Sequence, residues 1–346
     1  MTATNEGVRV QDVLSCILCG TKGTTLYAQV RDRLFGAPGL WNLLTCPGCG
    51  LVWVSPQPIP EELGKLYPTY QTHTAAKSPW TRMSRLRNAM KRGVLAAAFG
   101  YRQAGQPWAE VAAGRCLSWI GPVREIIGGG IMWLDASWRG RLLDVGCGNG
   151  QFLAEMRDLG WKVTGLDPDE RAVRLAREER GLEAYQGTLR DMKFPEQSFD
   201  VITLVHVIEH AHDPVGTLRE CFRVLKAGGR LVVRTPNVAS LGHRLFRAAW
   251  RGLEVPRHLH LFTPRTLLTC VQQAGFRDPH LWSTGRAARW TWASSRLLRR
   301  DGTLPGGAPQ RRGLRVALEG WVFQAVEEGL CLVQAVGEEL ALTAGK

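Results

Sequence analysis

Glycines at alternate positions follow a short apolar run in the middle of the chain and precede an amphipathic stretch. Glycine lets the backbone pass close to a bound ligand, and a turn that leads from a strand into a helix points N–H groups at that ligand. An acidic residue lies near the end of the apolar run, just before the glycines. The pattern therefore predicts a nucleotide-binding loop, formed by Asp144, Gly146, Cys147, Gly148, Asn149 and Gly150.

The spacing of these glycines distinguishes between two nucleotides. A dinucleotide fingerprint requires Gly or Ala where this chain has Gln151, so the pattern favours S-adenosylmethionine (SAM) over NAD. Asp167 lies 21 residues beyond Gly146, before Pro168, at the end of the next predicted strand. A carboxylate at that place accepts hydrogen bonds from the ribose hydroxyls of a bound nucleoside. The sequence therefore predicts a SAM site that includes Asp167 and Pro168.

A second polar cluster follows the fourth predicted strand, in the run VHVIEHAHDP at 205–214. Methyl transfer from a sulfonium is an in-line displacement, in which the protein supplies proximity, alignment and, for a hydroxyl acceptor, a base. Histidine is the natural base near neutral pH. The predicted catalytic residues are His206, Glu209, His210 and, from the later run RHLHLF, His258. Two other interpretations stay open: Glu209 and His210 orient the following helix, or His206 contacts the cofactor.

Two CxxC pairs lie near the N-terminus, separated by 26 residues: Cys16 with Cys19, and Cys46 with Cys49. Each pair can present two thiolates to one tetrahedral Zn²⁺, and four thiolates leave no coordination position open for catalysis. The pattern predicts a structural zinc site, and redox or incidental pairs are the alternative. The other five of the nine cysteines are expected to be ordinary buried thiols.

An alternating order of strands and helices is needed to position the nucleotide loop and the histidines. Short apolar runs predict strands at 141–145, 161–167, 182–186, 199–205 and 230–235. Amphipathic segments predict helices at 151–160, 170–181, 214–229 and 263–276, and a closing strand at 337–346. This order predicts an α/β fold, in which helices cover both faces of a mainly parallel sheet.

Several of these runs together resemble the class I SAM-dependent methyltransferases, notably the branch similar to ubiquinone-biosynthesis-type O-methyltransferases. The resemblance covers about residues 135 to 285 and implies a Rossmann-like, seven-stranded sheet. It is carried by DVGCGNG, LDPD, GTLRDMKFPEQSFDVITLVHVIEHAHDP, LRECFRVLKAGGRLVVRTPN and RHLHLFTPRTLLTCVQQAGF.

The resemblance also implies how the SAM site is divided. The loop from Asp144 to Gly150 would line the methionine side and Asp167 the ribose, while Thr188 and Leu189 would lie beside the adenine. Many relatives have an acidic residue near the adenine amino group, and this chain has QGTL at 186–189 instead. A backbone contact is therefore expected to replace it. Val205 completes the predicted cofactor set.

The formal charge of +13 is concentrated in one part of the chain, since no acidic residue lies between Glu62 and Glu110. Such a stretch favours an anionic neighbour: nucleic acid, an anionic membrane surface or an acidic substrate. Residues 80–101 have the pattern of an interfacial amphipathic helix, or of a helix packed on the core. The fourth strand lacks the Asn/Asp-Pro-Pro-aromatic run typical of nucleobase amino methylation, which makes nucleic acid the less favoured partner.

The sequence predicts four parts: a zinc module at 10–56, a basic helical connector at 57–138, a SAM-binding core at 139–285, and a basic and helical extension with the closing strand at 286–346. The predicted acceptor is a small or lipid-linked molecule, methylated at a hydroxyl oxygen. An RNA or protein methyltransferase and a non-catalytic SAM-binding or zinc scaffold are the alternatives. No secretory signal is visible, so we expect a cytoplasmic protein, with peripheral membrane contact as a further option. The oligomeric state is left open.

Overall fold

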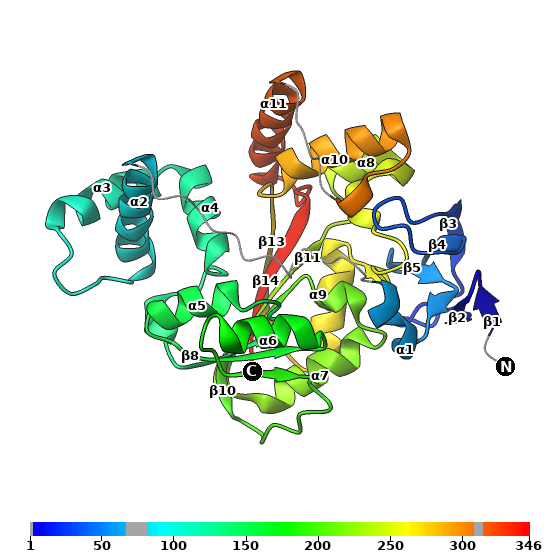
Figure 1. Ribbon diagram of the computed structural model, residues 1–346, viewed down its shortest axis with the longest axis horizontal. Helices are drawn as coiled ribbons and strands as arrows, with labels where there is room; N and C mark the ends of the chain where they lie inside the picture. The colour runs from blue at the N-terminus through cyan, green and yellow to red at the C-terminus, as the bar shows by residue number, and fades with distance from the viewer. Residues whose placement is uncertain (1–2, 67–81, 308–313) are drawn as a thin grey trace. The chain divides into compact units, whose positions relative to one another are not determined.

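The computed structural model describes residues 3–66, 82–307 and 314–346 (Figure 1). The chain divides into two compact units. The first unit comprises Met1–Tyr70, Leu204–Arg223 and Val233–Lys346, and the second comprises Gln71–Thr203 and Val224–Val232. The four parts expected from the sequence stay predictions, and residues 67–81 of the predicted connector lie outside the described residues.

A seven-stranded sheet has the order β13-β14-β11-β10-β7-β8-β9. β7 pairs in parallel with β8, and β8 in parallel with β9, whereas β13 and β14 are antiparallel. The predicted α/β fold with a mostly parallel, seven-stranded sheet is confirmed. The strands are β7 (Arg141–Val145), β8 (Lys162–Asp167), β9 (Ala184–Gln186), β10 (Phe199–Val205), β11 (Leu225–Pro236), β13 (Arg277–Thr284) and β14 (Glu339–Gly345).

The helices of the second unit fall into two sets: some follow strands of the sheet, and three others pack together as a separate group. α5 (Gln151–Asp158) and α6 (Glu170–Glu178) pack on β8. α2 (Arg82–Phe99), α3 (Trp108–Ser118) and α4 (Gly121–Gly130) pack on one another. A short 3-10 helix, η3 (Ala136–Trp138), leads from this group into β7.

The predicted amphipathic helix at 80–101 corresponds to α2 over its described length. Its last turns are buried, with Val94 and Phe99 at 0% and 5% exposure, whereas Leu86 near its start is 65% exposed. Gly93 of α2 meets Gly114 of α3 so closely that a Cβ on Gly114 would lie 2.0 Å from the Gly93 carbonyl carbon. The C-terminal half of the apolar side of α2 is therefore used for packing within the protein.

One predicted helix was too long. The segment 214–229 was expected to be helical throughout, but α7 (Pro214–Val224) ends where β11 begins. Leu225 is fully buried as the first residue of that strand. Gly228 has a φ of +75° and bends the strand instead of ending a helix. Glycines are compatible both with the end of a helix and with a bend within a strand, so the sequence did not distinguish these two structures.

The N-terminal part of the first unit consists of two small sheets. One contains β1 (Ala3–Asn5), β2 (Val8–Gln11) and β6 (Gln57–Pro58). The other has the order β12-β5-β4-β3, with β3 (Thr24–Val30), β4 (Trp41–Thr45), β5 (Val52–Ser55) and β12 (His260–Leu261). β12 comes from the RHLHLF run and pairs with β5. The N-terminal cysteine region and the RHLHLF run therefore share one sheet.

Helices complete the first unit. They are α1 (Pro60–Leu63), α8 (Leu241–Phe246), α9 (Pro264–Gln273), α10 (Ala288–Asp301) and α11 (Leu314–Cys331), with 3-10 turns η1 (Gly64–Leu66), η4 (Ile208–His210), η5 (Arg247–Ala249), η6 (Arg251–Leu253) and η7 (Pro305–Gly307). Thr263, the first residue of the segment 263–276 that was predicted to be helical, caps α9. α11 ends at Cys331 because the chain turns there, and the Val336 carbonyl accepts a hydrogen bond from the Leu241 amide. No helix of the described segments is both long and apolar enough to cross a membrane.

Candidate active site

The nucleotide loop of the second unit has the backbone that only glycine adopts readily. Gly146, Gly148 and Gly150 have φ values of +75°, +53° and +75°. A Cβ on Gly150 would lie 2.5 Å from Leu182 Cδ1, so this glycine is also required for packing. Just before the loop, the buried Asp144 accepts a hydrogen bond of 2.6 Å from the Thr203 hydroxyl. The loop therefore starts from a fixed carboxylate at the carboxyl end of β7.

Asp167 links this loop to the end of β8. One carboxylate oxygen accepts the Gly148 amide at 2.8 Å, and the other accepts the Asp169 amide at 2.9 Å. The carboxylate is therefore fixed beside the glycines by two backbone donors. Within the loop the Asn149 carbonyl accepts a hydrogen bond from Arg180, and the Cys147 side chain is buried. This arrangement fits a nucleoside with an anionic or polar tail.

The segment after β9 contains an acid that was not part of the predicted site. Gly187 has a φ of +138° and donates its amide to the Asp167 carbonyl. Asp191 accepts the amide and the hydroxyl of Thr188, at 2.9 and 2.6 Å, and these bonds lower the pKa of Asp191. Leu189 is buried. An acid thus lies three residues beyond Thr188, next to the segment that was expected to make a backbone contact.

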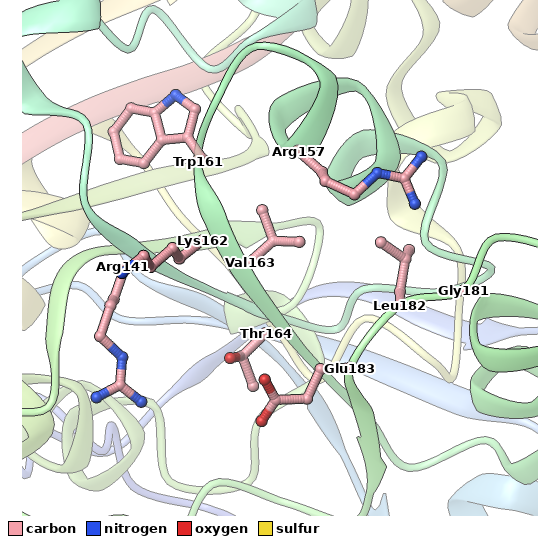
Figure 2. A pocket seen from close by; sticks show the side chains of 9 residues that line it. All are labelled: Arg141, Arg157, Trp161, Lys162, Val163, Thr164, Gly181, Leu182 and Glu183. Atoms are coloured by element: carbon pink, nitrogen blue, oxygen red, sulfur yellow. The ribbon is translucent and has the colours of Figure 1, made fainter.

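A separate cavity lies at the other end of these strands. It has a volume of about 390 Å³, and Figure 2 shows that Arg141 and Lys162, the first residues of β7 and β8, line it. The glycine loop follows the opposite, carboxyl end of β7. The cavity is therefore distinct from the predicted nucleotide site.

His206, in the first unit, follows β10 directly and has a strained backbone, with a φ of +54°. Its Nδ1 lies 3.1 Å from Glu209 Oε1 and its Nε2 lies 2.7 Å from Glu339 Oε1. Burial opposes the charged ring, but the two carboxylates outweigh it and raise the pKa of His206 to about 9. His206 is therefore a cation at neutral pH, with both ring nitrogens acting as donors.

Glu209 is fully buried and both of its oxygens are engaged. The second oxygen accepts the Thr235 hydroxyl at 2.9 Å. Burial would raise the pKa of Glu209, but His206 lowers it to about 2. Glu209 is therefore an anion, held in place by a neighbour from β11 as well as by His206.

His210 and His258 lie next to each other, with ring centroids 4.9 Å apart. His210 Nδ1 lies 2.9 Å from the Arg257 carbonyl, and His258 Nδ1 lies 2.8 Å from the Gly252 carbonyl. Because a carbonyl oxygen only accepts hydrogen bonds, the Nδ1 of each ring must carry a proton. In a neutral ring with this tautomer, the lone pair is on Nε2. Burial lowers the pKa of His258 to about 4, so that ring is neutral.

One ligand atom from each of Glu209, His210 and His258 lies within 4.8 Å of the others. Two imidazoles and one carboxylate, each with a second hydrogen bond that orients it, could hold a divalent metal ion. The same arrangement also places the Glu209 carboxylate where it stabilises a charged His210. The predicted catalytic residues of the first unit are thus brought together by the fold.

Three ion pairs that the sequence analysis missed lie around His258. Arg257 is fully buried and donates two hydrogen bonds to Asp32, of 2.8 and 3.0 Å. Glu254 pairs with Arg251 and Arg257, and these two cations keep the pKa of Glu254 far below its usual range despite its burial. An Arg directly before a candidate His was the only signal in the sequence, because Asp32 lies 225 positions away.

The four cysteines of the CxxC pairs meet. Their sulfur atoms all lie within 4.8 Å of one another, with Cys16 and Cys49 3.5 Å apart and Cys19 and Cys46 3.4 Å apart. Sulfurs bound tetrahedrally to zinc at ~2.3 Å lie about 3.8 Å apart, so the donor set fits the ion.

The two CxxC turns repeat one backbone pattern. The amide of the glycine after each pair, Gly20 or Gly50, donates to the carbonyl of the first cysteine, at 2.8 and 2.9 Å. Both glycines have positive φ, which such tight turns require. The backbone therefore aims all four thiols at one point.

Comparisons with known proteins identify the family of this chain. Residues 113–281 match a family model described as a methyltransferase domain. The ubiquinone biosynthesis O-methyltransferase of Cereibacter sphaeroides (strain ATCC 17025) is 32% identical over 168 residues, which cover 45% of this chain and 68% of that protein. The protein of the same name from Ruegeria sp. (strain TM1040) is 35% identical over 169 residues, covering 43% of this chain and 68% of that protein.

Among solved structures, a SAM-dependent methyltransferase of Thermotoga maritima, described as a possible histamine N-methyltransferase, covers 76% of this chain with 20% identity and a TM-score of 0.44. The assignment of this chain to a family rests on the relatives found by sequence. The chain belongs to the class I SAM-dependent methyltransferases. It is therefore an enzyme, and its cofactor is SAM.

Proposed function

We propose that this enzyme methylates a hydroxyl oxygen of a small or lipid-linked acceptor, with His210 as the general base. The geometry of His210 carries the proposal. Its Nδ1 is committed to the Arg257 carbonyl at 2.9 Å, so Nε2 has the lone pair that can take a proton. The names of the relatives from Cereibacter and Ruegeria, which are O-methyltransferases, support oxygen as the acceptor atom.

The proposed reaction needs little from the protein besides alignment and one proton transfer. SAM supplies a methyl group that is already activated by the sulfonium. As the new C–O bond forms and the S–CH₃ bond breaks, the hydroxyl proton passes to His210 Nε2, and S-adenosylhomocysteine leaves. The buried Glu209 anion stabilises the resulting imidazolium. His210 later returns the proton to water.

The neighbouring histidines have different proposed roles. His206 is already protonated between Glu209 and Glu339, so it cannot accept a proton and instead sets the charge and position of Glu209. His258 is neutral, buried and in contact with His210, and we assign it a positioning role. Of the four predicted catalytic residues, only His210 is proposed as the base.

The residues proposed to hold SAM are those of the glycine loop and of the ends of β8, β9 and β10. The Asp167 carboxylate, oriented by the Gly148 amide, would accept the ribose hydroxyls. The loop would hold the methionine side, with Asp144 at its start. The remaining members of the proposed set are Gly146, Cys147, Asn149, Gly150, Pro168, Thr188, Leu189 and Val205.

The four cysteines are proposed to hold a structural Zn²⁺. The closed set of thiols leaves no position for a substrate, so its role is to fold the N-terminal sheets. β5 of that region pairs with β12, which directly follows His258 and Leu259. Zinc would therefore support the acceptor side of the enzyme indirectly, through the strand that carries the RHLHLF run.

The experiment that tests this function uses methyl-labelled SAM and a panel of hydroxylated small molecules and bacterial lipid fractions, with product analysis by mass spectrometry. We expect a product whose labelled methyl group is assigned to an oxygen atom by fragmentation in the mass spectrometer and by its NMR chemical shift. Labelled RNA, labelled protein or an N-methyl product would contradict the proposed acceptor. SAM binding without transfer to any acceptor would support the non-catalytic scaffold instead.

A further inference from the structure

Two buried carboxylates of the first unit have no role in the proposed reaction. Glu327 of α11 is 0% exposed, and Glu338, just before β14, is 2% exposed. Neither oxygen of Glu327 has a hydrogen-bond partner among the described residues, and the same holds for Glu338 Oε1. Isolated buried anions cost several kcal/mol, so an acid in this position needs a proton or an added cation.

The neighbours of this pair add negative charge. Burial and the negative charges of Glu338 and Glu339 raise the pKa of Glu327 to about 10. Glu339 is itself compensated, by His206 at 2.7 Å and by Arg234 at 3.6 Å. In the part of the chain that the structure describes, no salt bridge joins Glu327 or Glu338 to a cation. Among the three neighbouring acids, Glu327 and Glu338 are therefore the two that lack a cationic partner in the described residues.

Aromatic rings border the acid pair. Trp250 Nε1 donates to Glu338 Oε2 at 2.7 Å. Phe323 lies one helical turn before Glu327, is also buried, and has its ring 4.7 Å from that of Trp292. Carboxylates beside aromatic rings are the surroundings that organic ammonium groups favour, whereas hard divalent metals require a shell of oxygen ligands.

Glycines allow the backbone to approach both acids. A Cβ on Gly242 would lie 1.8 Å from Glu338 Oε1, and one on Gly285 would lie 3.3 Å from Glu327 Oε2. The acid pair is also connected to the proposed catalytic residues, because Glu339 follows Glu338 in the chain and bonds to His206, which bonds to Glu209. A group bound by the pair would belong to the acceptor side of the site.

We infer that Glu327 and Glu338 form a subsite for a protonated amine, so that the methyl acceptor is an amine-bearing hydroxy compound. This inference rests on the proposed function for its link to the acceptor, but ammonium binding itself can be measured without turnover. The full-length protein is titrated with benzylammonium and with benzyl alcohol, a neutral probe of similar shape, by calorimetry and ligand-observed NMR.

We expect wild-type protein to bind benzylammonium more tightly than benzyl alcohol, and Glu327→Gln to weaken benzylammonium binding by at least about tenfold, as for loss of a charge-assisted contact. Benzyl alcohol should bind both proteins equally. Glu328→Gln is the matched control, because Glu328 is adjacent and bonds to Gln324. Should Glu327→Gln fail to fold, Glu338→Gln makes the same test, since its amide oxygen can still accept the Trp250 donor.

Equal binding of the two probes, or equal loss in Glu328→Gln and Glu327→Gln, would overturn the subsite. In that case the two acids share a proton as a structural element. Tighter binding of Mg²⁺ than of benzylammonium would overturn it in favour of a metal. A protein that O-methylates neutral acceptors but ignores benzylammonium contradicts only this inference, whereas ammonium binding without methyl transfer contradicts only the proposed function.

Discussion

Replacing His210 with alanine is expected to lower turnover by about 10² to 10⁴-fold, the usual contribution of a general base, while SAM affinity changes little. The Nε2 lone pair is lost, and Glu209 keeps its bonds to His206 and Thr235, so the surrounding network survives. Steady-state kinetics with any acceptor found by the labelling screen, together with SAM titration, measures both quantities.

His280→Ala is the matched control, because His280 is an exposed histidine on β13 that takes no part in this cluster. Its turnover should equal that of the wild type. Unchanged turnover in His210→Ala would show that His210 is not the general base. A large loss in His258→Ala with normal His210→Ala activity would transfer the role to His258. Activity that disappears with a chelator and returns with a divalent ion would instead favour the Glu209, His210 and His258 metal site.

Replacing Cys46 with serine is expected to release zinc and unfold the N-terminal sheets. Zinc binding supplies on the order of 10 kcal/mol of folding free energy in small Cys-ligated domains, and one lost thiolate removes most of it. Trp41 and Trp53 lie buried on β4 and β5, so their fluorescence should shift to longer wavelength. Metal content by mass spectrometry should fall from one zinc per chain to nearly none.

Cys116→Ser is the control for this prediction, since Cys116 belongs to the second unit and, contrary to the expectation that it is buried, is exposed on α3. It should keep its zinc and its stability. Because β12 pairs with β5, we also expect Cys46→Ser to lose methyl transfer while it retains part of its SAM affinity. A wild-type protein purified under reducing conditions without any metal would contradict the zinc proposal.

Much of the fold could be predicted because its signals are local. The strand that ends at Val145, the glycines after it and the acid at Asp167 are contiguous patterns, each with one physical reason. Thr263 and Pro264 likewise marked the start of α9. The end of α7 was predicted too late, because the glycines at 228 and 229 fit a turn within a strand as well as the end of a helix.

The contacts that define the candidate site were less predictable because they join distant parts of the chain. Glu339 meets His206 from 133 positions away, and Arg257 meets Asp32 from 225 positions away. In the sequence, Asp32 is simply an acid among basic residues, and Glu339 is part of a closing strand. Composition indicates which residues carry charge, but only the tertiary fold shows which charges are buried together. The protonated state of His206 follows from such a pairing.

The account depends most on the nucleotide that the glycine loop binds. Calorimetric titration of purified, nucleic-acid-free protein with SAM, S-adenosylhomocysteine and NAD, repeated with Asp167→Asn, tests it directly. We predict micromolar binding of SAM and S-adenosylhomocysteine, no binding of NAD, and at least about tenfold weaker binding to Asp167→Asn because the charged acceptor for the ribose is lost. Binding of NAD, or SAM binding that Asp167→Asn leaves unchanged, would contradict the site described here.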